Sequence, residues 1–322
     1  MSPRQRVASG GSGIGCWLFW GAHVLWLPAL MVGYVLWVGK LVLYSRRAPG
    51  TTTMLASVYP RWMMHRVRQR RDDACVRLVR VLPNVSQPGL WLLAAPTLLA
   101  VDREGRVVKR SGPEVAATRP GSTVKPFTLA ALLDAPGFDP VRRLGCSGRL
   151  RLGGRSFDCS HAPVPGGLDA EEALAFSCNS YFASMAGRFL DPAGFQRFLA
   201  GWGLRASLAS GPDGLRRQAL GEDFVAVTPL ELAQAYRRLA SRESDPKLLF
   251  AFRGLRLAVT AGTAHEAGAV FVGGKTGTAA TEGRRSLQGW FAGFTREHVV
   301  VVFVPTGRGA VDAAPLARRA LP

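Results

Sequence analysis

The stretch TRPGSTVKPFTLAALLD (118–134) places a lysine, Lys125, three residues after a serine, Ser122. The chain uses arginine for nearly all of its basic residues and has only five lysines. A serine hydroxyl becomes a nucleophile when a neighbouring base takes its proton. Arginine cannot be that base because its guanidinium stays protonated, whereas a buried lysine can lose its proton. The pair therefore indicates a serine nucleophile with a lysine base.

The local pattern predicts that this pair lies at the start of a helix. Pro120 and Gly121 predict a turn, and the apolar residues of 127–133 recur at helical spacing. Pro126 is compatible with a first turn, where backbone N–H groups have no helical partner. Residues i and i+3 share a helix face, and the helix N-terminus favours negative charge beside it. For this pair alone, a serine N-cap with a solvated lysine is the alternative.

Two further polar motifs follow, the first in a region of helical pattern and the second on a predicted strand. The resulting order, S-x-x-K, S-x-N and K-T-G, resembles the signature of penicillin-binding proteins and serine β-lactamases. Either short motif alone carries little information, but the three in this order indicate an acyl-transfer site. The residues are Ser177, Cys178 and Asn179 in the first motif, and Lys275, Thr276 and Gly277 followed by Thr278 in the second.

The resemblance implies catalytic roles for five of these side chains. Ser122 would attack the carbonyl of the penultimate D-Ala of a D-Ala-D-Ala stem peptide while Lys125 takes its proton. Ser177 would relay a proton between the lysines, including Lys275, and the departing D-Ala. Asn179 would offer its amide to the substrate backbone. The acyl-enzyme would pass to an amine of a neighbouring stem peptide and form a cross-link, whereas transfer to water would make a carboxypeptidase.

The remaining motif residues are expected to bind substrate. The hydroxyls of Thr276 and Thr278 suit a terminal carboxylate, and Gly277 lets a substrate backbone approach the strand closely. An extended peptide can then pair along that strand. By the same resemblance, the backbone N–H groups of Ser122 and Thr278 would hold the oxyanion.

The resemblance extends beyond the three motifs and is specific to the transpeptidases of high molecular weight. It covers roughly residues 92–320. It implies an α/β fold, with an antiparallel sheet flanked by helices and the site in the cleft between them. The segments that carry it are RPGSTVKPF, LDAEEALAFSCNSYF, VAVTPLELAQAYRRLA, GGKTGTA, GWFAGFTREHVVVVFV and AAPLARRAL.

A membrane anchor is predicted ahead of this domain. Residues 16–39 are apolar, and at about 1.5 Å per residue they span a bilayer core of about 30 Å. We therefore expect a cytoplasmic tail (1–15), a transmembrane anchor (16–43), a basic juxtamembrane segment (44–85) and a penicillin-binding transpeptidase domain (86–322). Flanking charges favour a cytoplasmic C-terminal side. The peptidoglycan substrate instead implies an extracytoplasmic domain on the inner (cytoplasmic) membrane.

Charge and segment lengths limit the partners. The net charge of +19 suits an anionic lipid or polymer, and we find no nucleic-acid motif and no Gly-rich phosphate loop. We expect peptidoglycan stem peptides as substrate, β-lactams as inhibitors, membrane lipid and a membrane partner in cell-wall synthesis. No cofactor, metal or nucleic acid is expected. Only about 45 residues separate the anchor from the first predicted strand, so no glycosyltransferase or pedestal domain is expected.

The five cysteines cannot all pair within one chain. Cys146 and Cys159 flank a predicted hairpin, and both a disulfide and two small buried side chains are compatible with that position. Cys178 is unusual in its motif and is expected to pack inward rather than act as a nucleophile. His161 and His265 have no second metal ligand at useful spacing, so we interpret them as structural or surface residues.

Other functions of the same superfamily remain alternatives. A β-lactam sensor would need a signalling domain, for which the tail 1–15 is too short. A weakly catalytic scaffold in a cell-wall complex would use the basic surface. A β-lactamase of the common class would need a dedicated glutamate that drives deacylation, and the nearest acids after S-x-N lie in no E-x-x-x-N context. Those acids are Asp191, Asp213, Glu222 and Asp223.

Overall fold

The computed structural model describes residues 95–211, 213–281 and 286–322. The expected tail (1–15), anchor (16–43) and juxtamembrane segment (44–85) lie outside these residues. Within the described part, no helix has both the length and the apolar character needed to cross a membrane.

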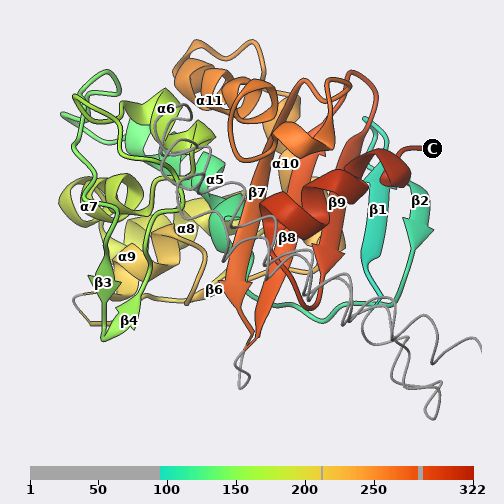
Figure 1. Ribbon diagram of the computed structural model, residues 1–322, viewed down its shortest axis with the longest axis horizontal. Helices are drawn as coiled ribbons and strands as arrows, with labels where there is room; N and C mark the ends of the chain where they lie inside the picture. Colours follow the sequence, from blue (N-terminus) through green and yellow to red (C-terminus); the bar gives the residue numbers. More distant parts are fainter. Residues whose placement is uncertain (1–94, 212, 282–285) are drawn as a thin grey trace, which may run out of the picture. The chain divides into compact units, whose positions relative to one another are not determined.

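A five-stranded antiparallel sheet forms one half of the described structure (Figure 1). The strand order is β2-β1-β9-β8-β7, so β7 lies at one edge. The K-T-G segment forms a strand, as predicted, and the other strands are an N-terminal pair and the two apolar runs that follow K-T-G. Their bounds are Thr97–Val101 (β1), Val107–Ser111 (β2), Gly273–Ala280 (β7), Leu287–Phe294 (β8) and Val299–Val304 (β9).

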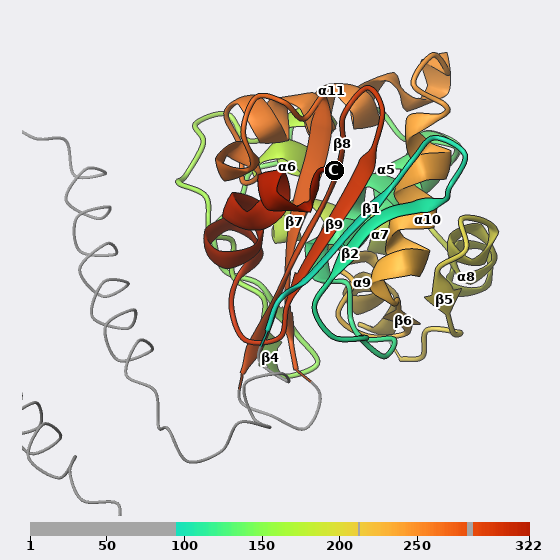
Figure 2. The same ribbon diagram turned by 90° about the vertical axis from the view of Figure 1, so that its right-hand side faces the viewer.

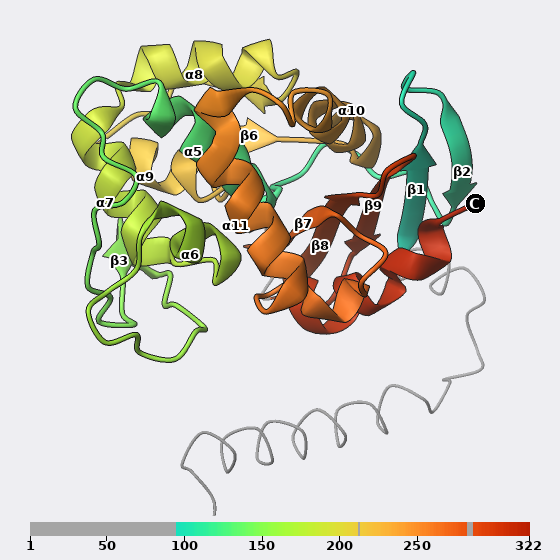
Figure 3. The same cartoon turned by 90° about the horizontal axis from the view of Figure 1, so that it is seen from above.

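Both faces of the sheet are covered. Along β9, Val301 packs into the larger core with the helices, whereas Val300 and Val302 pack into a second core with the C-terminal segment. Figure 3 shows helix α10 over one face, α11 alongside the edge strand β7, and the C-terminal turns, in dark red, over the other face. The chain ends beside β1 and β2 (Figure 2), where Lys109 donates to the carbonyl of Leu321. Burial on both faces explains why β9 reads as the continuous apolar run VVVVFV rather than an alternating one.

Helices gather beside the β7 edge of the sheet (Figure 1). Among them α5 is the most enclosed, because each residue from Lys125 to Leu132 is buried. The bounds are Lys125–Leu133 (α5), Ala170–Ala175 (α6), Asn179–Phe189 (α7), Pro192–Gly201 (α8), Gly214–Ala219 (α9), Pro229–Ala240 (α10) and Leu249–Thr260 (α11). Two short pairs complete this half: β3 (Arg151–Leu152) with β4 (Arg155–Ser156), which is the predicted hairpin, and β5 (Arg205–Ala206) with β6 (Val225–Ala226).

The serine helix differs in detail from the prediction, and proline shapes both this helix and the closing segment. The serine helix begins as a 3-10 turn, η1 (Gly121–Val124), and becomes α-helical only at Lys125, so that Pro126 lies in the first α-turn. The closing segment is a π-turn, η4 (Gly309–Ala313), followed by the 3-10 stretch η5 (Ala314–Ala320). Pro315 lacks the N–H that a continuous α-helix would require there.

Helix α10 links the sheet to the serine turn. Its Tyr236 hydroxyl donates to the Thr123 carbonyl at 2.8 Å, within the turn that holds Ser122. The helix begins with a reciprocal capping box, in which Thr228 Oγ1 accepts from Glu231 N and the Glu231 carboxylate accepts from Thr228 N. The capping box therefore helps to position the serine turn through Tyr236.

Removing this cap should destabilise the fold. We expect Thr228→Ala to lower the free energy of unfolding by about 1 kcal/mol, because a backbone N–H of the first helical turn loses its acceptor. Thr228→Ser keeps the hydroxyl and should remain close to wild type. Chemical denaturation of the full chain in detergent measures both variants. Equal stability of the alanine and serine variants would contradict the role assigned to this cap.

Candidate active site

The site is organised around the buried amine of Lys125. Its Nζ atom donates to the Ser177 carbonyl at 2.8 Å and to Asn179 Oδ1 at 2.6 Å, and it lies 3.2 Å from Ser177 Oγ. Ser177 lies between α6 and α7, and Asn179 is the first residue of α7. The first two motifs predicted from the sequence therefore meet in space, although more than 50 residues separate them in the chain.

The environment of Lys125 favours its neutral form. Burial lowers the pKa of Lys125 to about 8, partly opposed by the negative charge that Cys178, Cys159 and Glu222 can carry nearby. A neutral amine has two N–H donors and one lone pair. The Ser177 carbonyl and the Asn179 amide oxygen can accept only, so they take the two donors. The lone pair is then left to accept a proton from a hydroxyl, as a general base requires.

Ser177 adopts a backbone conformation that favours glycine, with φ at 58°. Its N–H bonds the Leu174 carbonyl, and the Cys178 N–H bonds the Ala173 carbonyl. These two bonds form a Schellman motif that ends α6, in which the left-handed position is usually glycine. A serine in that conformation costs roughly 1–3 kcal/mol, and such strain concentrates at functional sites. A side chain is therefore retained here at the expense of stability.

Ser122 lies half-buried in η1, which packs closely against the edge strand β7. A Cβ atom added to Gly277 would lie 2.5 Å from the Pro120 carbonyl oxygen. A Cβ atom added to Gly121, whose φ is +54°, would lie 2.6 Å from the Thr278 carbonyl oxygen. Glycine on both surfaces thus allows two backbones to approach. The sequence assigned Gly277 to substrate approach, and the structure adds that it admits the serine turn.

The K-T-G residues lie on β7. Two of their polar side chains already donate to an acceptor among the described residues, whereas the hydroxyl of Thr278 does not. Lys275 is fully buried and its Nζ donates to the Thr276 carbonyl, and burial together with the charge of Lys125 lowers its pKa. The hydroxyl of Thr276 is hydrogen-bonded to Thr263 Oγ1 at 2.8 Å. Thr278 Oγ1 accepts from Gly309 N at 3.0 Å, so its own proton remains free to be donated. Thr278 is thus better placed than Thr276 to donate to a substrate carboxylate.

Several residues that support the site were not found from the sequence. The indole N–H of Trp290 and the amide of Gln288 both donate to the Arg119 carbonyl, at 2.9 and 2.7 Å. They fix the chain just before the serine turn to strand β8. A Cβ atom added to Gly221 would lie 2.0 Å from the Gly121 carbonyl oxygen, which shows a third close backbone approach. The one available signal was Gln288, a polar residue in a strand whose neighbours are mostly apolar.

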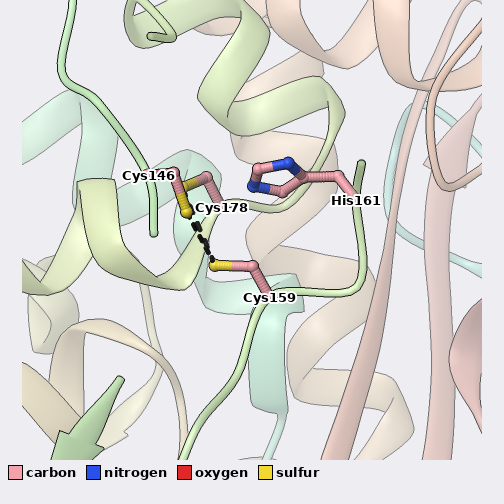
Figure 4. A group of neighbouring side chains, drawn as sticks. All are labelled: Cys146, Cys159, His161 and Cys178. Atoms are coloured by element: carbon pink, nitrogen blue, oxygen red, sulfur yellow. Dashed lines mark hydrogen bonds between the residues drawn. The ribbon is translucent and has the colours of Figure 1, made fainter. Parts of the chain in front are cut away.

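The cysteines depart from the sequence interpretation. Cys146 and Cys159 face each other as predicted, but they are free thiols with sulfurs 3.5 Å apart, so the disulfide alternative was wrong. Cys178 is buried, as expected. Its sulfur lies 3.8 Å from that of Cys159, and His161 joins the same cluster (Figure 4). The expectation that His161 has no second potential ligand was wrong. Cys159 lies two residues before it, and Cys146 and Cys178 join from other segments.

Residues 115–252 match the family model described as the penicillin binding protein transpeptidase domain. This part of the chain is therefore similar to that domain. The matched residues include Ser122, Lys125 and the S-x-N motif. No match was found among curated proteins.

Solved structures of penicillin-binding proteins share the fold. The chain resembles Pseudomonas aeruginosa PBP2 in complex with WCK 5153, with 19% identity, a TM-score of 0.61 and coverage of 72% of this chain and 74% of that one. The transpeptidase domain of Burkholderia pseudomallei penicillin-binding protein 3 is 19% identical, with a TM-score of 0.59. The match covers 72% of this chain and 88% of that one. PBP2 of Helicobacter pylori, in complex with MreC, is 15% identical, with a TM-score of 0.61. The match covers 72% of this chain and 60% of that one. The expected antiparallel sheet with flanking helices is thereby confirmed.

The close approach of η1 and β7 leads to a test of stability. Gly277→Ala should lower the free energy of unfolding by about 1–3 kcal/mol, because the added methyl group must push two backbones apart. Gly201→Ala, at a helical glycine with open space around it, is the matched control and should not destabilise. Denaturation of the full chain measures both. If the two variants are equally stable, η1 and β7 are not packed as described.

Proposed function

We propose that this protein is a membrane-anchored D,D-transpeptidase, which cross-links peptidoglycan stem peptides through an acyl-enzyme on Ser122. The observation that carries the proposal is the buried Lys125 amine, which is bonded to Ser177 and Asn179 one helical turn from Ser122. The site thus supplies a nucleophile and a base of suitably low pKa. The match of residues 115–252 to the penicillin binding protein transpeptidase domain supports the same chemistry.

The proposed reaction has two stages. In the first, Ser122 Oγ attacks the penultimate D-Ala carbonyl, Lys125 takes the hydroxyl proton, and Ser177 helps to pass a proton to the departing D-Ala as its C–N bond breaks. In the second, an amine of another stem peptide attacks the ester, a new C–N bond forms, and the serine recovers its proton. The backbone N–H groups of Ser122 and Thr278 stabilise the oxyanion in both stages.

Substrate binding is proposed along β7. This strand is a sheet edge, and an extended peptide can add to an edge by main-chain hydrogen bonds. The hydroxyls of Thr276 and Thr278 and the charge of Lys275 are proposed to receive the terminal carboxylate. The free proton of the Thr278 hydroxyl favours that residue for the direct contact.

The acids of the described chain favour a long-lived acyl-enzyme over β-lactamase activity. Each of the four candidates already has a structural partner. Asp191 accepts from Gly194 N, Asp213 accepts from Gly153 N, and both Glu222 and Asp223 pair with Arg155. No acid among these four is therefore free to activate water in deacylation.

The predicted anchor (16–43) supports a place in the inner membrane, with the catalytic domain extracytoplasmic, where peptidoglycan lies. The similarity to a PBP2 solved with MreC supports a membrane partner in cell-wall synthesis. Transfer to water would make the protein a carboxypeptidase, and loss of acylation would leave a scaffold or sensor.

The first test is intact-protein mass spectrometry of the full chain, purified in detergent and incubated with benzylpenicillin. We expect one stable adduct on the wild type and none on Ser122→Ala, because only the hydroxyl of Ser122 can form the ester. A drug consumed without an adduct would identify a β-lactamase. An intact drug without an adduct would favour the scaffold.

The second test is the pH dependence of acylation. A base must be unprotonated to act, so the rate should rise about tenfold per pH unit below the Lys125 pKa of about 8 and level off above it. Lys125→Arg should remove acylation, because guanidinium does not deprotonate. The exposed Lys247→Arg is the control and should keep the wild-type profile. A flat profile from pH 6 to about 9 would exclude Lys125 as the base.

A further inference from the structure

Four potential metal ligands converge beside the S-x-N motif. The donor atoms of Cys146, Cys159, His161 and Cys178 all lie within 4.8 Å of one another. They come from the segments on either side of the β3–β4 hairpin and from the N-cap of α7. Figure 4 shows the three sulfurs and the imidazole edge directed toward a common point.

The distances between the sulfurs fit a tetrahedral ion. A zinc–sulfur bond of about 2.3 Å and tetrahedral angles place two ligand sulfurs about 3.8 Å apart. The observed separations are 3.5 Å between Cys146 and Cys159 and 3.8 Å between Cys159 and Cys178. A disulfide would need about 2.05 Å. The spacing therefore suits a cluster that shares one ion.

Each sulfur also accepts a backbone N–H group. Hydrogen bonds to the charged form of a group favour that form, so these donors stabilise thiolates. Thiolates, not thiols, bind metals. The three pairs are Gly148 N to Cys146 at 3.3 Å, Asn179 N to Cys159 at 3.2 Å, and Tyr181 N to Cys178 at 3.4 Å.

The histidine presents a lone pair to the cluster. His161 Nδ1 lies 2.8 Å from the Ala162 carbonyl. A carbonyl only accepts, so in the neutral imidazole, the form that binds metals, Nδ1 carries the proton and Nε2 carries the lone pair. Nε2 is buried and has no hydrogen-bond partner among the described residues. A buried polar atom without a partner is costly, and a metal ion would satisfy it.

We propose that Cys146, Cys159, His161 and Cys178 form a structural site for one zinc-class divalent cation. Three sulfurs and one imidazole nitrogen are a ligand set that selects zinc among the common divalent ions. The protein fills all four tetrahedral positions, which leaves no open position for water or substrate and marks the site as structural.

The metal site would position the S-x-N motif as well as the segments that flank the β3–β4 hairpin. Cys178 lies between Ser177 and Asn179, so an ion bound to its sulfur constrains both neighbours. Asn179 also donates its side-chain amide to the Phe157 carbonyl at 2.9 Å, in the same segment as Cys159. The ion would therefore brace the strained Ser177 backbone and the amide that faces Lys125. This positioning role rests on the proposed function, whereas the metal site does not.

The metal content of the full chain tests the site directly. We would purify the chain in detergent under reducing conditions, offer Zn²⁺, remove excess ion and count metal by mass spectrometry. One zinc per chain is expected for the wild type and the His265→Ala control, and none for Cys146→Ser or His161→Ala. His265 is an exposed histidine outside the cluster. A wild type that retains no metal would overturn the proposal.

Two further measurements keep the test valid if a variant misfolds. Loading the wild type with Co²⁺ should give the intense thiolate-to-cobalt bands of a tetrahedral sulfur site, and His161→Cys should restore zinc binding with four thiolates. Mass spectrometry of the alkylated, non-reduced wild type should show Cys146, Cys159 and Cys178 protected by the ion and released together by a chelator. A disulfide between Cys146 and Cys159 in the freshly isolated chain would instead exclude the site.

The positioning role is measured separately. Removal of zinc by a chelator should slow penicillin acylation at least tenfold, and readdition should restore the rate. If zinc binds but its removal does not change the acylation rate, the proposed metal site stands and its positioning role is excluded. If zinc binds but penicillin never acylates the chain, the proposed metal site stands and the proposed function is contradicted.

Discussion

The arrangement of the site depends on the hydrogen bonding of one buried amine, that of Lys125. This amine has two acceptors, and no carboxylate of the described residues is hydrogen-bonded to it. A lysine paired with an acid would keep its proton, and a lysine in water would have its ordinary pKa. Here burial in α5 disfavours the charge, and the Ser177 carbonyl and Asn179 amide accept the two remaining N–H groups. The backbone geometry around S-x-N, including the strained Ser177, serves to present those acceptors.

Close backbone contact is the second constraint. The serine turn lies between β7 and the chain at Gly221, and glycine at 121, 221 and 277 makes this possible because any Cβ atom there would overlap a neighbouring backbone. Trp290 and Gln288 then hold the carbonyl before the turn. The nucleophile is thus located by main-chain packing rather than by contacts of its own side chain.

The sequence predicted the parts of the site that depend on local pattern. The strands, the serine helix and the order of the three motifs follow from hydrophobic period, proline and spacing. It could not predict the 3-10 start of the serine helix or the left-handed Ser177, because both depend on what packs against them. The cluster of Cys146, Cys159, His161 and Cys178 was also missed. Its ligands lie 13, 2 and 17 residues apart, and only the packing of the hairpin loop on α7 brings them together.

The strand order has a consequence for how the protein is made. Strand β1 pairs along its whole length with β9, although about 200 residues separate them in the chain. Such non-local pairing slows folding, because a long loop must close, at a cost in entropy, before the two strands can form stabilising contacts. The central strand β9, with its run VVVVFV, also comes after both of its neighbours, β1 and β8, in the chain. Until it arrives, β1 and β8 each lack a neighbour, and exposed strand edges of this kind associate readily with other chains. The sheet is therefore completed only when β9 has paired with both β1 and β8.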